Sequence, residues 1–81
     1  MLDGLIATCG IDNKKYDEGM FFHIFVISKN HRKVFMCEDG SWTEDINKRA
    51  ETDDFVFAYE QLATAFETEE KRNAIEASLL F

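Results

Sequence analysis

The clearest pattern in the chain is two apolar segments separated by a short polar one. Residues 20–27 are aromatic and β-branched apart from His23, residues 28–33 are polar, and residues 34–37 are apolar again. Aromatic and β-branched residues favour strands, so the pattern predicts a β-hairpin. The apolar side chains of its first strand would alternate between both faces of a sheet, which predicts a central strand covered on both sides.

The segments that flank this hairpin predict further strands. Residues 5–11 are mostly apolar, and we assign them to a strand that is followed by a polar connector over residues 12–18. On the other side, residues 38–41 contain Asp-Gly, which tolerates positive φ and indicates a turn.

Residues 42–50 allow two interpretations. We favour a third antiparallel strand over residues 42–46. A helix is the alternative, because Ser41 and Glu44 match a capping box, and Trp42, Ile46 and Ala50 have helical spacing.

The C-terminal third carries the helical patterns. Residues 55–57 alternate and predict a short strand at the sheet edge, before a helix that begins near Tyr59. An apolar stripe over residues 62–66 and a second one at Ile75 and Leu79 lie out of line at 100° per residue. This favours a break near Glu67 and a second helix over residues 69–80, capped by Thr68. One long helix buried on two sides is the alternative.

These elements predict an α+β fold in which a small antiparallel sheet of three to four strands packs against one or two C-terminal helices. With 81 residues the chain is long enough for one hydrophobic core, so residues 1–81 are expected to form a single domain. The longest dense apolar segment is far shorter than the roughly 20 residues that span a bilayer. No secretory signal is readable, and the two cysteines lack CxxC spacing, so we expect a soluble cytoplasmic protein.

Charge is distributed unevenly along the sequence. Residues 1–37 hold four acids and five bases (+1), and residues 38–81 hold twelve acids and four bases (−8), which together give the net charge of −7. Such a field repels nucleic acid and anionic membranes, and it attracts the basic grooves with which proteins hold phosphate backbones. The alternative is a solvated face that keeps a small domain soluble.

The residues expected to bind a partner lie in this acidic half, together with one aromatic that can anchor an interface: Glu38, Asp39, Trp42, Glu44, Asp45, Glu51, Asp53, Asp54, Glu67, Glu69 and Glu70. We expect no direct binding of nucleic acid or membrane. The basic segment 29–33, at the hairpin tip, is interpreted as protection of the sheet edge.

Catalytic and metal-binding motifs are missing from the sequence. Cys9, His23, His31 and Cys37 could supply four zinc ligands, but their spacings match no compact zinc motif. Cys37 and His23 could also pair as nucleophile and base, and ordinary strand positions explain them better. We therefore expect no enzyme activity, no metal and no cofactor.

In its size, lack of proline, acidic second half and sheet-plus-helix pattern, the chain resembles the small inhibitors that phages and mobile elements make against host defence enzymes. These include anti-CRISPR proteins and other DNA mimics. The resemblance is one of general character, and it carries over no site residue. It implies a non-catalytic inhibitor whose acidic C-terminal half occupies a basic, nucleic-acid-binding surface, such as that of a CRISPR effector in the host cytoplasm. The alternative is an adaptor, or a self-associating domain such as a homodimer, that binds through a sheet edge or the final helix.

Overall fold

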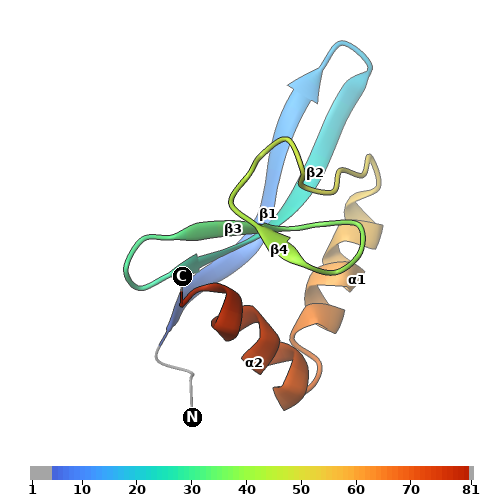
Figure 1. The fold of residues 1–81 in the computed structure, drawn as a ribbon. Coiled ribbons are helices and arrows are strands. Elements are labelled where there is room, and N and C mark those ends of the chain that lie inside the picture. Colours follow the sequence, from blue (N-terminus) through green and yellow to red (C-terminus); the bar gives the residue numbers. More distant parts are fainter. Residues whose placement is uncertain (1–4, 81) are drawn as a thin grey trace.

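The computed structural model describes residues 5–80, and Figure 1 shows a four-stranded antiparallel sheet followed by two helices. The elements are β1 (Ile6–Tyr16), β2 (Gly19–Ser28), β3 (Lys33–Met36), β4 (Trp42–Thr43), α1 (Phe55–Ala65) and α2 (Glu69–Ser78). The predicted α+β fold is therefore confirmed.

The strands lie in the order β1-β2-β3-β4, so each one pairs with its neighbour in sequence. The predicted hairpin of residues 20–37 is confirmed as β2 and β3, and β2 is an inner strand. β3 pairs only with residues 25–27 of β2, whereas β1 pairs along the whole length of β2. The β1–β2 hairpin consequently extends beyond the rest of the sheet (Figure 1).

The chain before α1 returns to the sheet and takes the place beside β2 that β3 leaves open. Phe22 donates its backbone N–H to Thr52 O (2.7 Å) and accepts from Thr52 N–H (3.2 Å), while Ala50 N–H donates to Met36 O (2.9 Å). Side chains alternate along this extended segment. Arg49 and Glu51 consequently reach one face of the sheet, where their partners lie, and Ala50 and Thr52 point to the other.

Both helices lie against one face of the sheet (Figure 1). The centre of the core consists of Val26 and Val34 from the sheet with Ile75 and Leu79 from the C-terminal end, all almost fully buried. Partly buried apolar side chains close this cluster: Ile6, Trp42, Ala65 and Phe66. The second apolar stripe, Ile75 and Leu79, therefore faces the core.

Two expectations about the sheet need correction. The polar connector predicted for residues 12–18 is wrong, because β1 continues to Tyr16 and only Asp17 and Glu18 form the turn. β2 is long enough to pair with residues 12–16, so the backbone groups of these residues form hydrogen bonds although their side chains are polar. The strand favoured at residue 42 is confirmed, but it ends at Thr43, since the Asp45 carboxylate accepts from Asn47 N–H and forms a turn.

The edge strand predicted for residues 55–57 is wrong. These residues form the first turn of α1, because Asp54 caps the helix by accepting from Phe57 N–H at 3.1 Å. The break between the two helices is confirmed, and Thr68 caps α2 by accepting from Lys71 N–H at 3.2 Å.

Removal of the α1 cap gives a direct test of this correction. We expect Asp54→Ala to lower the free energy of unfolding by about 1 kcal/mol, because the first helical N–H groups lose their acceptor. Urea unfolding measures the change. The matched control is Asp53→Ala, which removes the same charge one residue earlier and should cost clearly less. Equal losses in the two variants would contradict the capping role.

Candidate functional site

The acidic side chains of the C-terminal half lie almost entirely at the surface. Eleven of the twelve carboxylates in residues 38–81 are exposed, and Glu76 alone is buried. All ten carboxylates expected to contact a partner are in the exposed group. Trp42, the remaining residue of that set, is half-buried and packs against the core cluster, so its ring contributes mainly to the fold.

Some of these carboxylates organise the local backbone. Asp39 accepts hydrogen bonds from the N–H and the hydroxyl of Ser41, and these bonds lower the pKa of Asp39 below its usual value. Asp45 and Asp54 accept from backbone N–H groups in the same way. Each still exposes its charge, because hydrogen bonds to neutral donors do not cancel it.

Few of the carboxylates after residue 37 are matched by a basic side chain. Within residues 5–80, the ion pairs with lysine or arginine in this half are Glu44 with Arg32 (2.5 Å) and Glu67 with Lys71 (3.4 Å). Most of the negative charge therefore stays uncompensated. Arg32 and Lys33 of the basic hairpin tip are paired with Glu44 and Asp12, which reduces the positive charge of the tip.

The exposed acids do not gather at one point. Asp53 and Asp54 precede α1, and Glu67, Glu69 and Glu70 follow it. An eleven-residue helix spans about 16 Å at about 1.5 Å per residue, so these two groups lie at opposite ends of α1. These exposed acids thus form two groups separated by the length of α1, and Glu60 is the one acidic residue within the helix.

The first half of α1 adds apolar side chains to this surface. Phe55, Val56 and Tyr59 are 51%, 63% and 61% exposed. Residues one turn apart share a helix face, so Phe55 lies above Tyr59 and Val56 lies above Glu60, while Ala58 faces the sheet. Exposed apolar patches with polar surroundings mark interaction sites. We call Phe55, Val56 and Tyr59, with Asp53, Asp54 and Glu60, the α1 patch.

The sequence did not indicate the apolar part of the α1 patch, because residues 55–57 were predicted to form a short strand at the sheet edge. Aspartate is a common N-cap residue, so Asp54 was a signal in the sequence that a helix begins at residue 55. A helix that begins there places Val56 and Tyr59 on its outer face.

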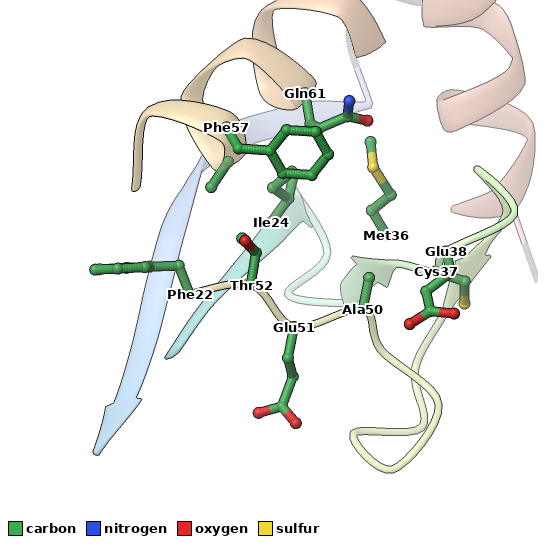
Figure 2. Close-up of a pocket in the computed structure, with 11 residues that line it drawn as sticks. Phe22, Ile24, Met36, Cys37, Glu38, Ala50, Glu51, Thr52, Phe57 and Gln61 are labelled. Atoms are coloured by element: carbon green, nitrogen blue, oxygen red, sulfur yellow. The ribbon is translucent and has the colours of Figure 1, made fainter. Parts of the chain in front are cut away.

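A pocket of about 320 Å³ lies between α1 and the sheet. Figure 2 shows the Phe57 ring beside Ile24 and Met36, whereas the Phe22 ring and the Glu51 side chain are directed away from them. The pocket is lined by Phe22, Ile24, Met36, Cys37, Glu38, Ala50, Glu51, Thr52, Phe57, Ala58 and Gln61.

A polar network lies on the sheet face opposite the helices. The Tyr16 hydroxyl donates to Glu51 Oε2 at 2.7 Å, and His23 Nε2 lies 2.9 Å from the same oxygen. The hydrogen bonds from Tyr16 and His23 lower the pKa of Glu51 because they favour its ionised form. The bond to the Glu51 carboxylate raises the pKa of Tyr16 because it favours the protonated hydroxyl. His23 is 1% exposed, and its Nδ1 has no hydrogen-bond partner among the described residues.

The chemistry that the network can perform is limited by its partners. His23 contacts Glu51, and no hydrogen bond joins it to Cys37 within residues 5–80. Cys9 and Cys37 are free thiols. The described part of the chain contains no group of three or more His, Cys, Asp or Glu side chains placed to hold a metal ion.

No helix within residues 5–80 has both the length and the apolar character needed to cross a membrane. Leu79 is buried and Leu80 is 62% exposed, whereas Phe81 lies outside the described residues. Comparison of the chain with protein-family models, with curated proteins and with solved structures found no match.

Proposed function

We propose that this chain is a non-catalytic inhibitor that binds the basic, nucleic-acid-binding surface of a partner protein, such as a defence enzyme of a host cell. One observation carries the proposal: eleven of twelve carboxylates after residue 37 are exposed, while two of them pair with lysine or arginine in the described chain. Exposed, unpaired carboxylates such as those of Asp53, Asp54 and Glu60 can compete with a phosphate backbone for the same cations.

The α1 patch adds apolar side chains that can provide binding affinity, which exposed charges alone do not. Uncompensated carboxylates speed the encounter with a basic surface and exclude partners of the wrong sign, but exposed charge pairs contribute little to affinity. Phe55, Val56 and Tyr59 can be buried on binding, and aromatic anchors of this kind dominate binding energy. The carboxylates of the patch would form a polar rim around these anchors.

A second function, self-association through the sheet edge, is favoured by a different observation. β1 is eleven residues long, and within residues 5–80 it pairs only with β2. Its other edge therefore presents backbone groups to which a second strand can bind.

Neutralisation of the α1 patch tests the inhibitor proposal. In Asp53→Asn/Asp54→Asn/Glu60→Gln, asparagine keeps the cap of α1. The matched control, Glu67→Gln/Glu69→Gln/Glu70→Gln, removes the same charge at the other end of α1. Each tagged chain is used to capture partners from host lysate at about 50 and about 500 mM salt, conditions under which exposed charges interact over very different distances.

The expected result is a basic, nucleic-acid-binding protein that is retained at low salt, lost at high salt and displaced by added duplex DNA. The α1-patch variant should bind it at least about tenfold more weakly than the control variant does, which corresponds to about 1.4 kcal/mol. A partner that resists salt and DNA would contradict the inhibitor proposal. A chain that elutes as a dimer in size-exclusion chromatography with light scattering would support self-association instead.

A further inference from the structure

The pocket beneath α1 has an apolar interior and a negative rim. Phe22 and Ile24 of β2, Met36 at the end of β3, and Phe57 and Ala58 of α1 form its walls (Figure 2). Phe57 is 49% exposed, so its ring stands at the opening as well as in the wall. A volume of about 320 Å³ is at the lower end of the range of small-ligand sites, which is large enough for one long side chain.

The charged side chains that line the pocket are acidic. Glu38 is exposed at the end of the pocket where β3 stops, and Thr52 and Gln61 provide neutral hydrogen-bonding groups. None of the eleven lining residues is lysine, arginine or histidine. Glu51 is also acidic, but its side chain is directed to the opposite side of the 50–52 segment (Figure 2), where Tyr16 and His23 contact it. Glu38 is therefore the carboxylate of the lining that is not engaged by Tyr16 and His23.

We propose that this pocket binds a single lysine or arginine side chain of the partner, with the aliphatic stem in the apolar interior and the cation at Glu38. This inference rests on the proposed function, since it assigns one residue of the basic partner surface to a defined place. Lysine and arginine bury their methylene stems along apolar surface while the charged end stays in water. The face of the Phe57 ring, which is 49% exposed, can also attract a cation.

Other occupants fit the same pocket less well. An anionic group would meet Glu38 with no compensating base in the lining. A purely apolar side chain would use the walls but gain nothing from the carboxylate. The pocket also adjoins the α1 patch, because Phe57 lies between Val56 and Ala58 in the first turns of α1. A partner seated on the α1 patch can therefore place a basic side chain in the pocket at the same time.

A titration of the whole ¹⁵N-labelled chain followed by NMR tests this chemistry without the partner. The probes are N-acetyl-L-lysine methylamide, its norleucine analogue, which has the same stem without the cation, and its glutamate analogue, all at constant ionic strength. We expect the lysine probe to shift the amide signals of Met36, Thr52, Ala58 and Gln61. It should bind about fivefold more tightly than the norleucine probe, the factor expected for unit charges about 4 Å apart in water. The glutamate probe should bind most weakly.

Two variants separate the pocket from general surface charge. Glu38→Gln should reduce the affinity for the lysine probe to that for the norleucine probe, and leave the latter unchanged. Glu18→Gln, which removes an exposed carboxylate of the turn between β1 and β2 that does not line the pocket, should leave both affinities unchanged. Equal binding of the lysine and norleucine probes, an equal effect of the two variants, or lysine-induced shifts spread over the carboxylates instead of the pocket would each overturn the proposal.

The titration and the capture experiment fail independently. Capture of a basic partner with no binding of the lysine probe would keep the inhibitor proposal and remove the pocket from it. Binding of the lysine probe with no basic partner in the lysate would keep the pocket as a site for cationic side chains and remove the inhibitor.

Discussion

Ile75→Ala is expected to lower the free energy of unfolding by about 2–5 kcal/mol. Ile75 is 1% exposed and lies at the centre of the core cluster with Val26, Val34 and Leu79. Truncation removes buried methyl groups and leaves a cavity that a sheet on one side and a helix on the other cannot fully close. Since small domains are stable by only a few kcal/mol, the variant should be largely unfolded at a urea concentration that leaves the original chain folded.

Two further variants make this measurement specific. Ile75→Val removes a single methylene and should cost about 0.5–1.5 kcal/mol. Arg72→Ala changes an exposed position on the same helix and should remain within about 0.5 kcal/mol of the unsubstituted chain. If Ile75→Ala cost no more than Arg72→Ala, α2 would not pack on the sheet as described.

The second large effect is expected at Glu51. Glu51→Ala should cost about 1–3 kcal/mol, the penalty of leaving a buried polar group without a partner. The group left unpaired is the His23 ring, which is 1% exposed and has Glu51 as its hydrogen-bond partner among the described residues. Tyr16 loses the acceptor of its hydroxyl in the same variant. Glu51→Gln retains an oxygen acceptor and should cost less.

The stabilisation by Glu51 depends on pH, and its sign follows from the lowered pKa. A carboxylate whose folded pKa lies below its unfolded value contributes stability above the unfolded pKa and loses it as pH falls through the folded pKa. The difference in stability between the unsubstituted chain and Glu51→Ala should therefore be full at pH 6–7 and shrink once pH falls below about 4.5. Urea unfolding across this range measures the difference, and a constant difference down to pH 3 would contradict it.

The parts of the fold that could be predicted from the sequence are those in which one periodicity is uninterrupted. β2 and β3 alternate over apolar residues on both sides of a polar turn, and the stripe of Ile75 and Leu79 follows a threonine that can cap a helix. In each case local propensity and burial favour the same element, so the interpretation does not depend on tertiary contacts.

The parts that could not be predicted depend on pairing over long distances. Residues 12–16 are polar, and they are a strand only because β2 supplies a partner for each of them. Residues 55–57 alternate like a strand, but the Asp54 cap and the contact of Ala58 with the core determine a helix. Short apolar segments carry no clear period, so such tertiary contacts decide their structure.

The candidate site also has one part that the sequence predicts and other parts that it does not. Surface exposure of the carboxylates follows from the cost of burying charge, and the structure places all ten predicted ones at the surface. In contrast, Tyr16, His23 and Glu51 meet across separations of up to 35 residues. The pocket arises where β3 ends opposite the middle of β2 and leaves the first part of β2 without β3 as a neighbour. Neither arrangement has a local pattern in the sequence.

The order of the strands also bears on how the chain reaches its native state. Because β1, β2, β3 and β4 pair consecutively, the sheet can form one hairpin at a time, and each step closes only a short loop. The bridge between Phe22 and Thr52 joins residues 30 positions apart, so closing its loop costs more entropy than closing a hairpin. Contacts close in sequence are the ones that accelerate folding, so the helices would dock last, onto a sheet that is already formed.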